Sequence, residues 1–586
     1  MVSSINKAKI PIAAPKLNRF DIPECQITTS SFMRFSLAAH KHVIKRTTLK
    51  CHHDTFIRTA PLDKPFYGNV MVHDRAFFVP YRVVWEPWED FRNNVPHNQP
   101  QGTQLLSYCP SMSASEILNA LTRSVNYTFT SEVTSSALYD FSLNNHYYVF
   151  TQSGRAAVTL LESLGYKIGT YKTENPKFNC LGLLCLAKIY IDWYWPSAYG
   201  HYGRAAWLDG IFQRQVYYEL NAEEIEIILG TLLYVCYDSD FYTSLWDNPV
   251  GVNPGTGSVD FEILDPTLPS LSDDNYVRVT PEGTPYVSNN DESSPLMVYS
   301  QFNDAALKAL TSYVARHRLA GSRSLERALA SYGVMLSAEK LRRCYYLGSN
   351  EYPLHVADVM STAETSEASL GSYAGKAVSS SAKTFESYSD EDGMFAVINS
   401  IVPLPIYYQG IDANVEARSI LDFHNGEFDG LGPVSVKGTN LFVGRSGMAA
   451  TDTNTNNILN SQVFGFAPRY YHLKIPYNRI TGDFAFVTVN QDLKPWFMGR
   501  DVTPDFSNLS NFKHNLDFVI GLDATQYKNV FLTNTDSETS TDVFYIIHRD
   551  HYTLESPMKA LYDTFEFEDE ENNRKVTTEP NGVKFN

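Results

Sequence analysis

Residues 71–91 read MVHDRAFFVPYRVVWEPWEDF, and this stretch is the most informative part of the chain. It begins as a strand, because bulky and β-branched residues lie on both sides of Asp74 and Arg75. Pro80 ends the pattern, since a proline cannot donate a hydrogen bond inside a sheet. The stretch therefore predicts a buried β-strand that stops at an abrupt corner.

The corner itself is rich in aromatic residues. Trp85, Trp88 and Phe91 recur at every third position, so one short helical turn places the three rings on one face. Pro87 suits the start of such a turn, where a missing N–H costs little. On chemistry alone, this is a hydrophobic strand end that packs under a core.

Composition favours a large β-protein. The chain has 586 residues and is 43% hydrophobic, which is enough to bury a substantial core. It holds 37 tyrosines and 34 phenylalanines, and both residue types favour strands. A single β-domain with long insertions reaches this size.

Charge and cysteine content exclude some classes of protein. The net charge of −17 argues against a surface that grips nucleic acid everywhere, so DNA contacts are expected in a local patch or through another chain. The seven cysteines form no C-x-x-C pair, which indicates reduced thiols rather than a disulfide framework or a zinc ribbon. The first fifteen residues lack the apolar segment of a signal peptide, and a soluble, reducing compartment is expected.

The two ends of the chain differ in charge. Residues 1–26 are predicted to form a basic arm, and residues 551–586 an acidic tail. Between them, residues 27–550 are predicted to form one domain with insertions at about 112–300 and 301–395.

The insertions differ in character. Residues 254–295 hold six prolines and eight acidic residues, which predicts an exposed loop on the outer surface. Short helices are expected at 114–122 and 154–164, and two longer ones within 301–333. Residues 361–390 are rich in Ser, Thr and Ala and are expected to form a loop.

Strand patterns return late in the chain, at residues 394–408, 463–475, 484–489, 516–521 and 543–548. Strands at both ends with insertions between them favour sheets that are built from distant segments. The predicted fold is mainly β: a single eight-stranded jelly-roll sandwich with long, partly helical insertions between its strands.

Further motifs follow the opening stretch in a fixed order. They are YVARHRLAGSRSLERALASYG at 313–333, Leu347-Gly348, ASLGSYAGKAV at 368–378, LPIYYQGI at 404–411, DFHNGEFDGLG at 422–432 and FGFAPRYYHLKIPYNRITGDF at 464–484. Together with residues 71–91, this series resembles the major capsid proteins of microviruses, which are small tailless phages with single-stranded DNA. The likeness is greatest to the gokushovirus-like branch. Residues 112–295 contain no matching motif.

The resemblance implies a coat protein that assembles, through pentamer precursors, into a small T=1 icosahedral shell around a circular single-stranded DNA genome. Contacts between different surfaces of neighbouring subunits can close into a shell, because each subunit presents several complementary surfaces. The resemblance implies assembly in the cytoplasm of a bacterial host, location in the virion, and no enzymatic activity or cofactor. Expected partners are the packaged DNA, a small basic DNA-binding phage protein and a host surface receptor, with scaffolding and pilot proteins as further candidates.

The candidate nucleic-acid contacts lie in the arm: Lys7, Lys9, Lys16 and Arg19. A basic arm neutralises phosphates without reading sequence. The same arm could instead connect neighbouring subunits, and the sequence leaves both roles open. Aromatic residues on the inner wall of a shell could also stack on unpaired bases.

Five histidines lie close together in the sequence: His40, His42, His52, His53 and His73. His40 and His42 are two residues apart, so they point to the same side of a strand. The spacing is not that of a zinc motif, and polar strand faces or interface positions are the favoured interpretation. No metal site and no catalytic residue is predicted.

The rival class is a carbohydrate-binding or carbohydrate-active jelly roll. Four aromatic residues could stack on sugars beside the carboxylate of Asp192: Trp193, Tyr194, Trp195 and Trp207. The competing explanation, which we favour, is a cluster of aromatic rings in the core or at an interface.

Overall fold

The computed structural model describes residues 16–62, 70–99, 102–123, 128–134, 139–169, 175–195, 219–245, 343–357, 376–418, 422–426, 434–443, 463–486, 496–500 and 542–559, apart from a few single positions, with short pieces elsewhere. No helix within these residues is both long and apolar enough to cross a membrane.

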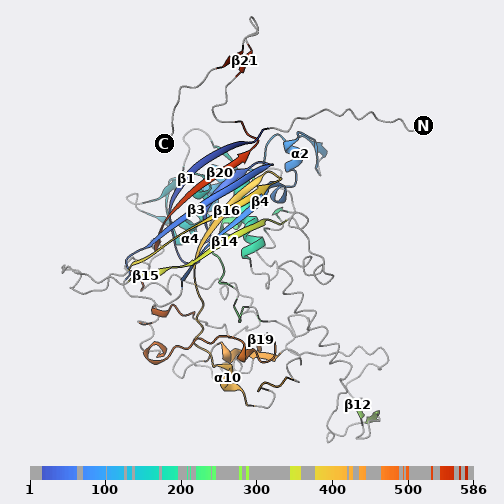
Figure 1. Ribbon diagram of the computed structural model, residues 1–586, viewed down its shortest axis with the longest axis vertical. Coiled ribbons are helices and arrows are strands. Elements are labelled where there is room, and N and C mark those ends of the chain that lie inside the picture. The colour runs from blue at the N-terminus through green and yellow to red at the C-terminus, as the bar shows by residue number, and fades with distance from the viewer. Residues whose placement is uncertain are drawn as a thin grey trace, which may run out of the picture.

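Two antiparallel sheets form the centre of the molecule (Figure 1). The first contains, in spatial order, β1 (Asn18–Ser30), β20 (Phe544–Ser556), β3 (Thr47–Thr59), β16 (Lys376–Ser389) and the short β15 (His355–Ala357). The second contains β14 (Tyr345–Pro353), β4 (Val70–Pro80), β17 (Gly393–Pro403) and β2 (Ser36–Val43). The long strands alternate between the sheets along the chain, except from β4 to β14, and this order is that of a jelly roll. The prediction of a mainly β sandwich is confirmed.

Three predicted boundaries are wrong. Strand β1 begins at Asn18, inside the predicted arm, and β20 continues to Ser556, inside the predicted tail. Strand β16 occupies much of the predicted loop at 361–390. All three segments look polar because one side of each strand faces outward, which hides the strand when hydrophobic residues are sought.

The predicted short helices are confirmed. Helix α3 (Ala114–Thr122) and helix α4 (Gln152–Ser163) each begin after a hydroxyl side chain that accepts a hydrogen bond from the first turn. These cap residues are Ser113 and Thr151, which accept from the backbone N–H groups of Glu116 and Gly154. The sequence pattern and the capping chemistry therefore agree.

The other elements of the first insertion lie between β4 and β14. Its helical elements are α1 (Tyr81–Val84), α2 (Trp88–Arg92), α5 (Leu181–Ile189), the π-helical turn η1 (Tyr190–Tyr194) and α7 (Ala222–Thr231). Its short strands are β5 (His97–Gln99), β6 (Gly102–Gln104), β7 (Ser111–Ser113), β8 (Thr130–Val133), β9 (Phe141–Leu143), β10 (His146–Phe150), β11 (Lys177–Asn179), β12 (Tyr276–Val279) and β13 (Pro285–Ser288). The paired strands β12 and β13 are the described part of the acidic segment 254–295, and the predicted helices within 301–333 lie outside the described residues.

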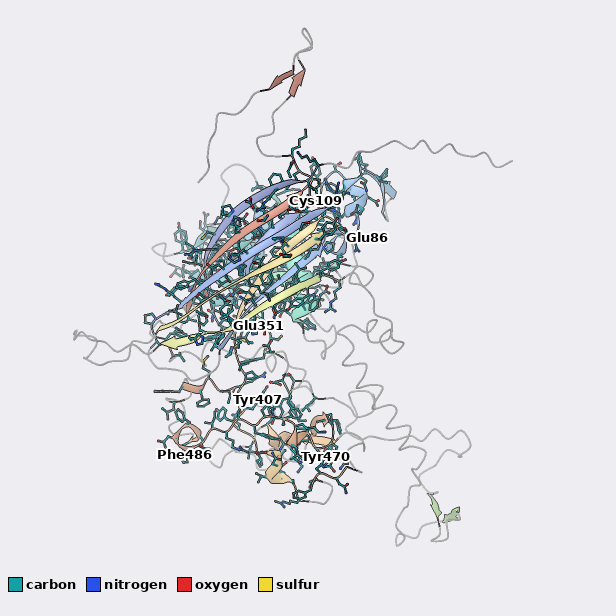
Figure 2. The ribbon with its side chains drawn as sticks, viewed as in Figure 1. Glu86, Cys109, Glu351, Tyr407, Tyr470 and Phe486 are labelled. Atoms are coloured by element: carbon teal, nitrogen blue, oxygen red, sulfur yellow. The ribbon has the colours of Figure 1, made fainter. Side chains whose placement is uncertain are left out.

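The second insertion lies between β17 and β20, not at the predicted 301–395, and it forms a small core together with Tyr242 and Leu245 of the first insertion. Its elements are α10 (Ala413–Glu416), β18 (Val434–Lys437), η3 (Gly438–Asn440), β19 (Val463–Ala467), η4 (Tyr471–Leu473) and η5 (Gly482–Ala485). Figures 1 and 2 show this lobe, with Tyr407 and Tyr470, below the two sheets. Residues 484–485 belong to the 3₁₀ turn η5, so a strand beginning at 484 is wrong, and the predicted strand at 516–521 lies outside the described residues. After β20 follow the short strands β21 (Glu566–Glu568) and β22 (Lys575–Thr577).

The aromatic corner packs as predicted. Trp85 is 1% exposed, and its ring centre lies 5.4 Å from that of Phe91 and 6.5 Å from that of Trp88. Two short helices form the corner, since α1 ends before Trp85 and α2 begins at Trp88. The rings therefore meet although no single helix carries them.

The outer faces of the two sheets differ. In the second sheet, every residue of β17 is buried, because α5 and the turn η1 of the first insertion pack over β4. Phe77 on β4, for example, contacts the rings of Trp193 and Tyr194. In the first sheet, alternate residues of β1, β3 and β20 point outward and are exposed or partly exposed. Within the described residues, one face of the sandwich is thus largely covered and the other is open.

Candidate assembly and nucleic-acid surfaces

The open face of the first sheet carries many charges, most of them paired. Cross-strand neighbours include Lys50 and Glu386, whose charged atoms lie 2.9 Å apart, and Arg549 and Asp54, 3.7 Å apart. These pairs leave little net charge in the centre of the face. The centre of the open face is therefore not strongly basic.

The structure places two of the four predicted DNA contacts. Lys16 is exposed just before β1, and Arg19 points outward from β1, where it forms an ion pair of 3.2 Å with Asp21. Hydrogen bonds from Thr553 and Arg19 lower the pKa of the Asp21 carboxyl. Lys7 and Lys9 lie outside the described residues. Of the four, Arg19 is thus a strand residue with a carboxylate partner.

The histidines predicted together are separated by the fold. His40 and His42 share one side of β2, as predicted, with ring centres 6.1 Å apart. Burial lowers the pKa of His40 to about 4. His52 and His53 are neighbours in β3 but face opposite ways, so His52 is exposed and His53 is fully buried. In the described part of the chain, no group of three or more potential metal ligands is found.

A buried polar network connects the two sheets. The Nδ1 atom of His53 lies 2.6 Å from the carboxylate of Asp550, and its Nε2 atom lies 2.8 Å from the hydroxyl of Thr55. That hydroxyl also lies 3.1 Å from Nδ1 of His548. From the second sheet, Asp74 approaches to 3.8 Å from Nε2 of His53.

Both hydrogen-bond donors to the carboxylate of Asp74 come from its own sheet. The carboxylate accepts hydrogen bonds from the Asn399 amide, at 2.7 Å, and from the Tyr352 hydroxyl, at 3.2 Å. His53 and Asp74 are recognisable in the sequence as a histidine cluster member and a strand residue, whereas no predicted site included His548 or Asp550. The sequence pattern that could have identified these two residues is the alternation of buried and exposed positions in β20, where every second side chain, including those of His548 and Asp550, points inward.

Ionisation in this network follows from its partners. Burial alone would lower the pKa of His53, but its hydrogen bond to Asp550 and the nearby negative charge of Asp74 raise it to about 9. Burial lowers the pKa of His548 to about 3, and the nearby His53 cation adds to this effect. Burial would raise the pKa of Asp74, yet His53 and Asn399 hold it below its usual value. The network therefore holds one charged and one neutral histidine at neutral pH.

The aromatic cluster that suggested sugar binding packs mainly into the core, with Tyr194 buried and Trp193 38% exposed. Asp192 is buried, its carboxylate lies 3.1 Å from the Lys188 ammonium, and it accepts a hydrogen bond from the backbone N–H of Cys344. The Trp193 ring lies under the guanidinium of Arg343, 4.1 Å from its centre. Trp207 lies outside the described residues. The cluster thus supports interior packing rather than a sugar site.

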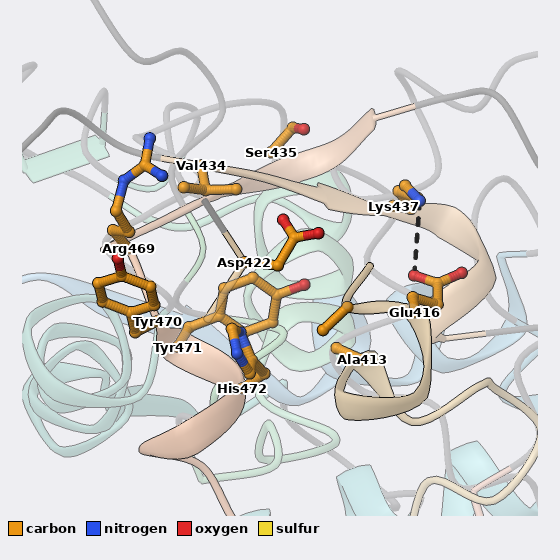
Figure 3. Close-up of a pocket in the computed structure, with 11 residues that line it drawn as sticks. Ala413, Glu416, Asp422, Val434, Ser435, Lys437, Arg469, Tyr470, Tyr471 and His472 are labelled. Carbon is orange, nitrogen blue, oxygen red and sulfur yellow. Dashed lines mark ion pairs between the residues drawn. The ribbon is translucent and has the colours of Figure 1, made fainter. Parts of the chain in front are cut away.

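A polar pocket of about 240 Å³ lies in the second insertion (Figure 3). Lys437 closes one side through an ion pair of 3.7 Å with Glu416. Glu416 also accepts hydrogen bonds from Thr439 and Asn440. Since this carboxylate serves the fold of the lobe, the pocket gives no indication of a reaction.

A jelly roll with long insertions is compatible with a coat protein, but this fold also serves other functions, so the family match decides the class. The chain belongs to the phage family described as Capsid protein (F protein), whose family model matches residues 8–136 and 294–532, more than half of the chain. It is therefore a major capsid protein, a structural component of a phage particle. The unmatched residues 137–293 fall inside the region where no motif was found. No curated protein matches the chain.

Proposed function

We propose that this chain forms a small icosahedral shell that encloses a circular single-stranded DNA genome. The match to the capsid family, on both sides of the first insertion, is the observation that carries the proposal. The jelly roll supports it, because its insertions supply the different surfaces that a closed shell requires. The role is structural, and the carbohydrate alternative has no support in the buried cluster around Asp192.

The negative charge suggests how the genome is neutralised. A chain of net charge −17 cannot balance packaged phosphates by itself, so we infer a small basic phage protein as a partner. Scaffolding and pilot proteins, a host surface receptor and assembly in the host cytoplasm complete the proposal. The acidic segment 254–295 is proposed to face outward, since carboxylates close to packaged DNA would be repelled.

Assembly is the direct test. The full chain, expressed in a bacterial host with its phage partners, is expected to yield uniform spherical shells or pentameric precursors in electron micrographs. A reconstruction of the shells would also show the side on which residues 254–295 lie. A chain that remains monomeric at high concentration with those partners would refute the coat function.

The basic arm gives a second prediction. Replacing Lys7, Lys9, Lys16 and Arg19 with serine should leave the fold intact, because Lys16 is exposed and Arg19 holds only a surface ion pair. We expect less packaged DNA per shell, measured by absorbance of purified particles, or looser subunit contacts, measured by particle melting. A serine at Lys167, an exposed residue next to α4, serves as the control. Shells with a full genome and normal melting would show that the arm has neither role.

A further inference from the structure

Two neighbouring rows of side chains on the open face differ from the rest of that face. Strand register places one row across β1, β20, β3 and β16, and its members are Thr29, Tyr545, Arg58 and Val378. The adjacent row contains Ile27, Ile547, Phe56 and Ser380. We call these two rows the stacking platform. All eight residues lie on the outward side of the sheet, and the hydroxyl of Thr29 also donates a hydrogen bond to Asp542.

The platform exposes large hydrophobic side chains that nothing in the described part of the chain covers. Ile27 is 78% exposed, Tyr545 46% and Val378 41%. Phe56 and Ile547, between them, are partly exposed. Single exposed hydrophobic residues are normal on protein surfaces, but a contiguous group marks a binding surface.

The platform carries one charge, the guanidinium of Arg58. This group lies over the Phe56 ring, 5.1 Å from its centre. In the described part of the chain it forms no ion pair, whereas Arg549 and Lys50 on the same face each pair with a carboxylate. An aromatic surface with one unpaired cation and no carboxylate favours a partner that combines flat rings with negative charge.

We propose that the stacking platform binds single-stranded DNA. The inference deepens the proposed function, on which it rests, by assigning a site for the enclosed genome. Unpaired bases present flat faces that stack on Tyr545 and Phe56, and Arg58 is placed to contact a phosphate. Binding of this kind is independent of sequence, as packaging of a whole genome requires.

The arrangement of the sandwich supports this choice. Within the described residues, the first insertion covers most of the outer face of the second sheet, so the first sheet offers its strands more directly to a partner. At the other end of the open face, Tyr388 is 61% exposed but lies two positions along β16 from Glu386, on the same side. The row across the sheet that contains Tyr388 also holds Glu555, whereas neither row of the platform holds a carboxylate, which makes Tyr388 a matched control.

The test uses the unassembled full-length subunit and a fluorescein-labelled oligonucleotide of about twenty thymidines, followed by fluorescence anisotropy. The wild type is expected to bind this strand more tightly than a duplex of equal length. The variant with Tyr545→Ala and Arg58→Ala should bind about tenfold more weakly, and Tyr388→Ala should bind like the wild type. Photocrosslinking with a bromodeoxyuridine strand should label peptides that contain Phe56 or Tyr545.

Three outcomes would overturn the inference. The wild type could fail to bind the oligonucleotide, the double variant could bind as tightly as the wild type, or the crosslinks could map elsewhere. A double variant that forms no shells yet keeps its DNA affinity would identify the platform as a contact between subunits. Electron micrographs of the same preparations separate these results from failure of the coat function, because the wild type must still form shells if only the platform assignment is wrong.

Discussion

Replacing Asp542 with alanine is expected to destabilise the subunit by about 3–5 kcal/mol, because it leaves a buried cation unpaired. The carboxylate lies 2.7 Å from Nη1 of Arg34, and both side chains are almost fully buried. It also accepts hydrogen bonds from Thr29 and Ser31, so it joins the end of β1 to the start of β20. Urea unfolding of the unassembled subunit, followed by tryptophan fluorescence, measures the change.

A matched exposed pair provides the control. Glu386 bonds Lys50 on the open face, where both side chains are more than half exposed. Glu386→Ala should therefore change the unfolding midpoint little. The double substitution Arg34→Met with Asp542→Leu should recover much of the loss, since it removes the buried charges together. An Asp542→Ala subunit as stable as Glu386→Ala would show that the buried pair contributes little.

Raising the pH from 6.5 to above 9 is expected to remove up to about 3 kcal/mol of stability through His53. Its pKa in the folded protein is about 9, above the ordinary value of 6.5, because Asp550 and Asp74 favour its charged form. Below pH 6.5 the ring is protonated in both the folded and the unfolded states, so the stabilisation is fully present. It is lost as the pH rises through 9 and the folded protein releases the proton.

His548 acts in the opposite direction. Burial lowers its pKa to about 3, so it stays neutral in the folded protein while the unfolded chain takes up a proton below pH 6.5. Its contribution is therefore lost as the pH falls from 6.5 towards 3, and the lowered pKa of Asp74 adds a further loss under acid conditions. Together these groups predict a maximum of stability near pH 6.5.

Adjacent histidines allow a clean comparison. Urea unfolding across pH 5 to 10 should show a smaller alkaline loss for His53→Gln than for the wild type. His52→Gln, which alters the exposed neighbour on the other side of β3, should keep the wild-type profile. An alkaline loss that is the same in all three proteins would place its origin outside the network. The wild-type profile alone decides the point if His53→Gln does not fold.

Much of the fold could be predicted from the sequence because local chemistry determined it. The strand before Pro80, the aromatic corner and helices α3 and α4 depend on periodicity, proline geometry and caps, which neighbouring residues specify. The polar strand β16 was missed because its outward side is rich in Ser and Thr, and only pairing with β3 holds it in the sheet. Whether residues 376–389 form a strand therefore depends on pairing with β3 as much as on their own side chains.

The candidate sites divide in the same way. Residue order alone indicated a capsid protein, a basic arm and an excess of negative charge, because these depend on composition and on motifs along the chain. Only the tertiary structure brought Tyr545 beside Arg58, nearly five hundred positions apart in sequence, and placed His53 between Asp550 and Asp74. Strand register between distant segments decides such neighbours, and it is set by the packing of the whole sandwich, which no local stretch of sequence contains.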